Sequence, residues 1–163
     1  MQEKPVIVNN TPLVALWELD LFSLLRELYA EVWIPPAVKD EFLKIDSSAR
    51  QASLESATWI KTVGLRHPQR TFTYAGLHHG ESSVLALARE HNARLVIMDE
   101  RKARLYAQRM GLQVTGTIGV LLFAKEKELI GAVKPLINSL HERGLYMSST
   151  LIFEALRLAG EVD

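Results

Sequence analysis

Two polar residues follow short apolar runs that are typical of buried strands. Asn9 comes directly after the run 6–8, and Asp99 follows the run 95–98 in the same way. In a parallel sheet wound in both directions, ligands bind beyond the carboxyl ends of the strands. If both runs belong to one such sheet, Asn9 and Asp99 lie at its ligand-binding edge.

Two glutamates, Glu41 and Glu81, interrupt apolar stripes at helical spacing. The stripes consist of Val38, Phe42 and Ile45 around Glu41, and of Val84, Leu85 and Ala88 after Glu81. A carboxylate that points toward a core costs free energy unless it is paired, protonated or bound to metal. Together with Asp99, the two glutamates suggest carboxylates that converge on one hard cation such as magnesium or manganese, which prefers oxygen ligands.

Each of these residues also has a simpler interpretation. Asp99 can cap the N-terminus of the next helix, and Glu81 can be a solvated first-turn acid favoured by the helix dipole. Glu41 can lie at a frayed helix end or form a salt bridge with Lys44. Asn9 alone can be a turn residue. The metal hypothesis therefore rests on the four residues together.

The helix expected after Asp99 carries a basic face. Its long polar side chains are Arg101, Lys102, Arg104, Gln108 and Arg109. Lys and Arg groups of this kind bind phosphate backbones, although a solvated face balanced by Glu100 is the alternative. Because 19 basic residues balance 19 acidic ones, only such local charge can indicate a nucleic-acid partner.

Several other kinds of site are absent from the sequence. There is no cysteine, which excludes disulfides, thiolate zinc sites and cysteine nucleophiles. His78 and His79 are adjacent, and neighbouring residues seldom bind one ion together. The segment 116–119 lacks the further glycine and lysine of phosphate-binding loops. A receiver-like phospho-acceptor domain needs an acidic pair where this chain has Asn9 and Asn10.

The composition and the element pattern predict one α/β domain. A chain of 163 residues fits a single domain with a substantial core, and short apolar runs that alternate with helices indicate a parallel sheet covered on both faces. Thr11, with Pro12 after it, is expected to cap the first helix, and Asp20 the second. We expect strands at 5–8, 32–34, 59–63, 95–98 and 113–115, a loop at 65–77, and helices at 13–19, 21–29, 36–42, 47–57, 81–91, 100–110, 117–128, 133–143 and 149–159.

The sequence also favours a cytoplasmic location. No segment approaches the roughly 20 apolar residues of a membrane span, and the first residues lack the apolar stretch of a signal peptide. The absence of cysteine suits a reducing compartment.

Four motifs, in this order, resemble those of PIN domains. The motifs are Val6-Ile7-Val8-Asn9-Asn10-Thr11-Pro12-Leu13, Ile34-Pro35-Pro36-Ala37-Val38-Lys39-Asp40-Glu41-Phe42, Gly80-Glu81 and Val96-Ile97-Met98-Asp99-Glu100-Arg101. Their order and spacing match over 5–115, and the part from 116 onward resembles a prokaryotic subfamily of uncharacterised PIN-like proteins described as predicted nucleic-acid-binding proteins. The resemblance implies a three-layer α/β/α sandwich with about five parallel strands. We expect one domain over 1–163, with a core at 5–127 and a C-terminal helical extension at 128–163.

The resemblance further implies a magnesium- or manganese-dependent endoribonuclease, commonly a toxin of the VapC type. Its partners would be RNA, a small antitoxin protein and a second copy of the chain. Catalytic and metal-binding roles would pass to Asn9, Glu41, Glu81 and Asp99, and substrate contacts to Thr11, Arg101 and Lys102. Asn9 stands where the family has its first aspartate, which removes one negative charge. The alternative is therefore a weak or inactive PIN-like module that binds RNA or protein.

Overall fold

A central sheet of five parallel strands organises the protein. The computed structural model describes residues 4–162, and its strands are ordered β3-β2-β1-β4-β5. The strands are β1 (Val6–Val8), β2 (Val32–Ile34), β3 (Ile60–Thr62), β4 (Leu95–Ile97) and β5 (Val114–Thr115). The central position of β1, between β2 and β4, explains why its three side chains are all buried.

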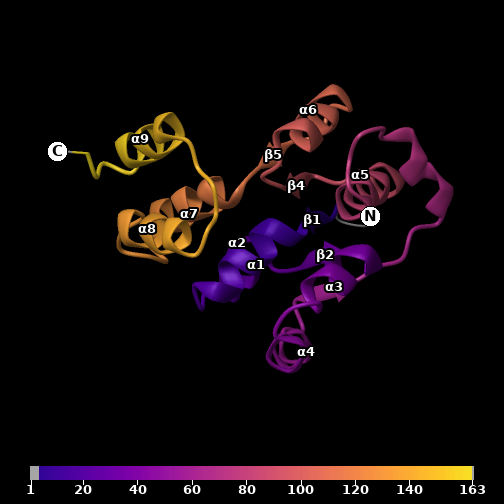
Figure 1. The fold of residues 1–163 in the computed structure, drawn as a ribbon, viewed down its shortest axis with the longest axis horizontal. Helices are drawn as coiled ribbons and strands as arrows, with labels where there is room; N and C mark the ends of the chain where they lie inside the picture. Colours follow the sequence, from indigo (N-terminus) through magenta and orange to yellow (C-terminus); the bar gives the residue numbers. More distant parts are fainter. Residues whose placement is uncertain (1–3, 163) are drawn as a thin grey trace.

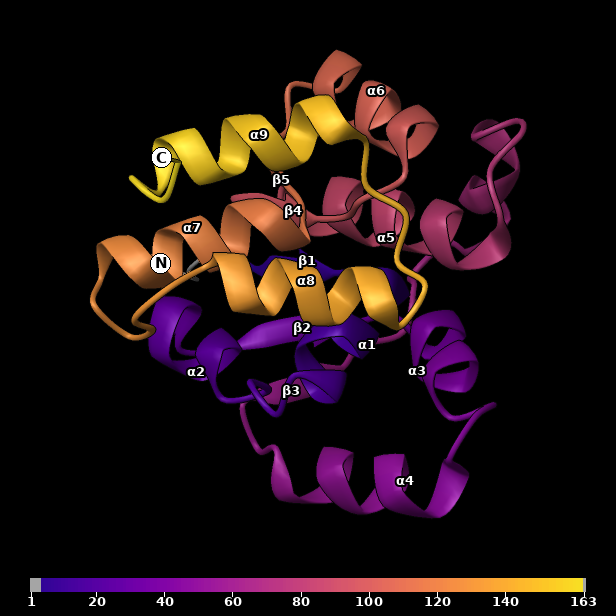
Figure 2. The ribbon, with the colours of Figure 1, turned by 60° about the vertical axis from the view of Figure 1, so that its left-hand side comes forward.

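Helices cover both faces of the sheet, which makes the three-layer sandwich (Figures 1 and 2). Helix α7 contacts α1 and α2 on one face, and α5 and α6 contact each other on the opposite face. The helices are α1 (Asn10–Glu18), α2 (Leu24–Tyr29), α3 (Pro36–Phe42), α4 (Ser47–Ser56), α5 (His79–His91), α6 (Arg101–Arg109), α7 (Thr117–Glu126), α8 (Lys134–Glu142) and α9 (Ser149–Leu158), with a short 3-10 helix, η1 (Pro68–Thr73), before α5. The α/β/α architecture expected from the sequence is confirmed.

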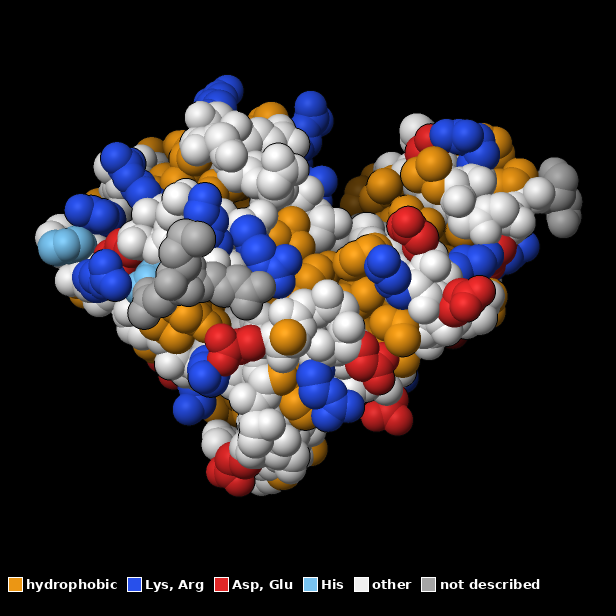
Figure 3. Space-filling model, turned by 180° about the vertical axis from the view of Figure 1, so that it is seen from behind, with side chains coloured by type: hydrophobic (Ala, Val, Ile, Leu, Met, Phe, Trp, Pro, Cys, Tyr) orange, Lys and Arg blue, Asp and Glu red, His pale blue; other side chains and the backbone are white. Residues whose placement is uncertain are grey.

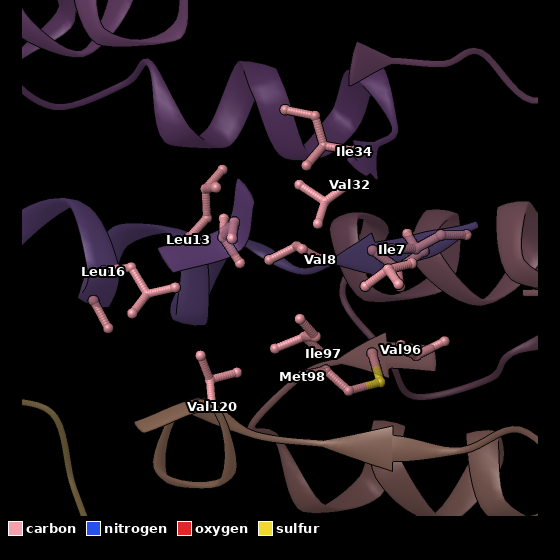
Figure 4. Packing of buried hydrophobic residues seen from close by; sticks show 14 of the residues in the cluster. Ile7, Val8, Leu13, Leu16, Val32, Ile34, Val96, Ile97, Met98 and Val120 are labelled. Atoms are coloured by element: carbon pink, nitrogen blue, oxygen red, sulfur yellow. The ribbon is translucent and has the colours of Figure 1, made fainter. Parts of the chain in front are cut away.

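The core follows from the alternation of side chains along each strand. Val8 pairs with Ile97 in register, so the two side chains project from the same face of the sheet. There they meet Leu13 of α1 and Val120 of α7, whereas Ile7 projects from the other face (Figure 4). All five side chains are fully buried, and burying each such side chain stabilises the fold by about 1.5–3 kcal/mol.

Two expected helix starts are wrong. The first helix begins at Asn10, with Asn9 in the capping position, so Thr11 and Pro12 lie inside its first turn. The first turn tolerates Pro12 because the backbone N–H groups there have no partner within the helix. Asp20 does not cap α2, because it adopts a left-handed conformation with φ of 56° and the helix begins only at Leu24.

Helices α7, α8 and α9 are joined by one carboxylate. Glu161 accepts hydrogen bonds from Lys125 Nζ at 2.8 Å, from the Val133 N–H at 2.8 Å and from the Lys134 N–H at 2.9 Å. Lys125 Nζ also donates to the Ala159 carbonyl. The end of α9 is thereby attached to the last turn of α7 and to the start of α8.

The helices of the structure are short. Within the described range 4–162, none is long and apolar enough to cross a membrane.

Candidate functional site

The carboxyl ends of β1 and β4 place Asn9 and Asp99 at the same edge of the sheet. The Asn9 N–H donates to the Ile97 carbonyl at 2.9 Å, which continues the pairing of the two strands by one residue. Asn9 is only 5% exposed, and its side chain does not cap α1. A buried amide group that the helix does not use is available to a ligand at this edge.

Glu41 approaches Asn9 because Gly80 has no side chain. A Cβ atom on Gly80 would lie 2.7 Å from Glu41 Oε1 and 3.9 Å from Asn9 Oδ1. The second carboxylate oxygen, Glu41 Oε2, accepts a hydrogen bond from Asn10 Nδ2 at 3.2 Å. Helices α1, α3 and α5 thus meet here, and two hard oxygen atoms border the space beside Gly80.

Glu81 lies in the first turn of α5, directly after Gly80, and is half-buried. Its Oε2 accepts a hydrogen bond from the His78 N–H at 3.1 Å, which caps the helix. Burial raises the pKa of the Glu81 carboxyl, the His78 N–H opposes this rise, and the negative charges of Glu100 and Glu41 add to it. Burial is the main cause of the raised pKa, and the two neighbouring carboxylates make smaller contributions in the same direction.

Asp99 is held by Thr117, at the start of α7. The Thr117 N–H donates to Asp99 Oδ1 at 2.7 Å and the Thr117 hydroxyl donates to Oδ2 at 2.6 Å. The helix that directly follows Asp99 is capped by Glu100 instead, which accepts from the Ala103 N–H at 2.8 Å. Asp99 therefore caps α7, and the simpler interpretation, in which it caps the next helix, is wrong.

The expectation that Glu41 points into the core is also wrong. Helix α3 ends at Phe42, so Ile45 lies outside the helix and is 63% exposed. The apolar stripe stops one turn early, and Glu41 is exposed at the rim of the sheet edge rather than buried below it. Glu41 faces the site because of Gly80 and Asn10, which the spacing along one helix could not indicate.

Of the three residues predicted to contact substrate, Thr11 and Arg101 line pockets that border this edge. Thr11 is exposed and lines a pocket of about 450 Å³ together with Asn10 and Glu41. Arg101 is exposed and lines a groove that begins at Asp99. Lys102 lines neither of these pockets, and its Nζ occupies the space where a Cβ on Gly76 would be.

Four residues at the site were missed in the sequence. Gly80 and Asn10 position Glu41, Thr117 positions Asp99, and Glu100 adds a negative charge near Glu81. Asn10 and Thr117 each lie two residues after the end of a strand. This position is the signal that could have identified them. No local pattern distinguishes Gly80 from an ordinary glycine at a helix start.

The oxygen donors suit a hard divalent cation in their chemistry. Across residues 4–162, no group of three or more His, Asp or Glu side chains is arranged to hold a metal ion. Magnesium, however, is usually bound through one or two carboxylates while it keeps several waters. Glu41 and Asn9, which face one space beside Gly80, fit such a site.

Comparison with known proteins agrees with the resemblance seen in the motifs. A protein-family model described as a PIN domain matches residues 5–161 of the chain. No curated protein is significantly similar to it.

Proposed function

The chain belongs to the PIN-domain family, a nuclease-like family, and from this we propose that it is a divalent-metal-dependent endoribonuclease of the VapC type. The observation that carries the proposal is the convergence of Asn9 and Glu41 beside Gly80 at the sheet edge where Asp99 also lies. An RNA substrate agrees with the family and with the arginines next to Asp99.

The proposed roles come from the family motifs, and the positions of the side chains support them. Glu41 and Asn9 would hold magnesium or manganese, with Glu81 and Asp99 contributing directly or through water. The bound ion would activate water for attack on a phosphodiester and stabilise the developing charge. Asn10 orients Glu41 through its hydrogen bond, and Thr117 fixes both oxygens of Asp99.

Substrate contacts are proposed for three residues outside the acidic group. Arg101, exposed at the start of α6, would contact an RNA phosphate, and Lys102 on the same turn would contact another. Thr11, exposed in the first turn of α1 beside Glu41, would donate its hydroxyl to the substrate.

The test is RNA cleavage by the purified protein with and without Mn²⁺. Glu41→Gln and Asp99→Asn should each lower the cleavage rate at least about a hundredfold, because each removes a charge from the proposed site. Glu126→Gln is the matched control, since Glu126 is exposed at the opposite end of α7 from Thr117. Cleavage that needs no metal, or that both site variants retain, would refute the proposal.

A second candidate is a non-catalytic module that binds RNA or protein. It is favoured by the buried amide of Asn9 and by the absence, within residues 4–162, of three acidic or histidine groups arranged around one point. The discriminating measurement is Mn²⁺ affinity by calorimetry. No detectable binding by the wild type, with binding restored in Asn9→Asp, would favour this module over the enzyme.

Two protein partners are also proposed, a small antitoxin and a second copy of the chain. Helix α9 supports this, because Leu151, Phe153 and Leu158 on it are 45%, 57% and 62% exposed. If the chain is a toxin, its induced expression in bacteria should arrest growth, and Glu41→Gln should abolish the arrest. Light scattering of the purified chain tests the dimer directly.

A further inference from the structure

A groove of about 440 Å³ runs from Asp99 between α6 on one side and α7 and α9 on the other. Figure 3 shows it as a hollow between the lobe that contains α9 and the rest of the molecule, with hydrophobic side chains inside. The volume lies within the roughly 300–1,000 Å³ of small-ligand sites. The groove is therefore large enough for one nucleotide next to the candidate site.

Arg104 is a positively charged side chain that is held in place at this groove. It is half-buried, and its Nη1 donates to the Met98 carbonyl at 3.0 Å. The missing side chain of Gly116 leaves room for it, because a Cβ there would lie 2.9 Å from Arg104 Nη1 and 2.5 Å from Asp99 Oδ1. The guanidinium is thus held beside Asp99 before any substrate arrives, so little conformational entropy is lost on binding.

The hydrogen-bonding groups of the groove favour an anion. Both oxygens of Asp99 already accept hydrogen bonds from Thr117. A guanidinium has five N–H donors, and among the described residues the structure gives Arg104 one hydrogen bond and no salt bridge. Arg101 also lines this groove. The groove therefore has more N–H donors and positive charges than unused acceptors, which suits a phosphate group.

Apolar side chains from three helices also line the groove. Leu105 of α6 and Leu151 of α9 are 41% and 45% exposed, and Ile118 of α7 lines the groove with them. A free inorganic anion would gain nothing from these side chains. A nucleotide would gain from both kinds of group, because the face of its base is apolar while its phosphate is charged.

We propose that this groove binds one nucleotide of a single-stranded RNA next to the cleavage position, with Arg104 gripping its phosphate and Leu105 and Leu151 contacting its base. The proposal rests on the proposed ribonuclease function and adds the path of the substrate. A base is accessible to these apolar side chains only when it is unpaired, so duplex RNA should bind more weakly.

The experiment measures binding of a fluorescein-labelled oligoribonucleotide in metal-free buffer, where no cleavage is expected, over a series of salt concentrations. Arg104→Gln should weaken binding about tenfold or more, as expected for a hydrogen bond to a charged group, and should reduce the slope of log K against log salt by about 0.7. Arg101→Gln should act in the same direction. Leu151→Ala should weaken binding without changing the slope.

Arg109→Gln is the matched control, because Arg109 is exposed on the same helix and does not line the groove. Melting temperatures show whether the loss of the Met98 contact unfolds Arg104→Gln, and the exposed Arg101 tests the groove without that contact. If the wild type cleaves RNA while Arg104→Gln and Arg101→Gln keep its affinity and salt slope, the groove proposal is overturned and the proposed function stands. If the wild type neither binds nor cleaves RNA, both are overturned.

Discussion

The carboxylate of Glu161 offers a quantitative test of how the C-terminal helices are held. It accepts one charged and two backbone hydrogen bonds, and its side chain is only 14% exposed. Burial alone would raise the pKa of this carboxyl, but the hydrogen bonds from Lys125 and from the two N–H groups, with the ammonium charge, outweigh it and lower the pKa to about 2. We predict that Glu161→Gln destabilises the fold.

The size of the loss follows from the lowered pKa. A shift from 4.5 to about 2 corresponds to roughly 3 kcal/mol at 1.36 kcal/mol per unit. Because the carboxylate keeps some contact with water, we expect about 2 kcal/mol. For a protein of this size, that loss lowers the melting temperature by roughly 4–8 °C.

The pH dependence has a definite sign. Since the pKa of Glu161 is lower in the folded protein than in the unfolded chain, its contribution is complete above pH 4.5 and is lost as the pH falls toward 2. The difference in unfolding free energy between wild type and Glu161→Gln should therefore narrow as the pH is lowered from 5 to 3.

Urea unfolding monitored by circular dichroism measures this difference. Glu154→Gln is the control, because Glu154 is also on the C-terminal side but is exposed and, among the described residues 4–162, is paired only with Arg157, so it should have no clear effect. Equal stabilities of wild type and Glu161→Gln at pH 7, or a difference that does not change down to pH 3, would refute the reasoning.

Three further predictions concern the site and the loop before α5. Gly80→Ala should lower the rate of RNA cleavage at least about tenfold, because the added Cβ clashes with the flexible end of Glu41. The free energy of unfolding should change by less than about 1 kcal/mol. RNA cleavage and urea unfolding measure the two effects, and an unchanged cleavage rate would contradict the prediction. Thr117→Val should cost about 1–2 kcal/mol and slow cleavage, because one oxygen of Asp99 loses its donor; Thr117→Ser should restore both properties. Glu90→Gln should speed tryptic cleavage of the loop, because Glu90 accepts two of its backbone N–H groups; an unchanged digestion rate would contradict the anchoring role.

The fold could be predicted from the sequence because its signals are local. Apolar runs such as 6–8 and 95–97 cannot be exposed, and their alternation with helices leaves a covered parallel sheet as the simplest arrangement. The strand order β3-β2-β1-β4-β5 depends on which strands pair across long connections, and no local pattern encodes it. Helix starts were less predictable, since Asn9 and Thr11 are both acceptable caps and packing decides between them.

The arrangement of the candidate site was predictable only where topology alone positions a residue. Asn9 and Asp99 follow strands that pair directly, so their proximity follows from the fold class. Glu41 was expected at the site for a wrong reason, because helical spacing placed it in a stripe that ends at Phe42. The contacts of Thr117 join residues 18 apart in the chain, and only the folded structure brings them together.

In the proposed metal site, Asn9 would link the stability of the fold to the affinity for the metal ion. The residue is 5% exposed. Nearby, burial raises the pKa of Glu81, and the negative charges of Glu100 and Glu41 add to this rise. An aspartate at the same position would add a buried charge to this group, which is unfavourable in the metal-free protein. The same added charge would attract a divalent cation more strongly. The amide keeps an oxygen atom beside Gly80 and adds no charge. If the proposed metal site exists, we therefore expect a stable metal-free fold together with weaker metal binding than an aspartate at this position would give.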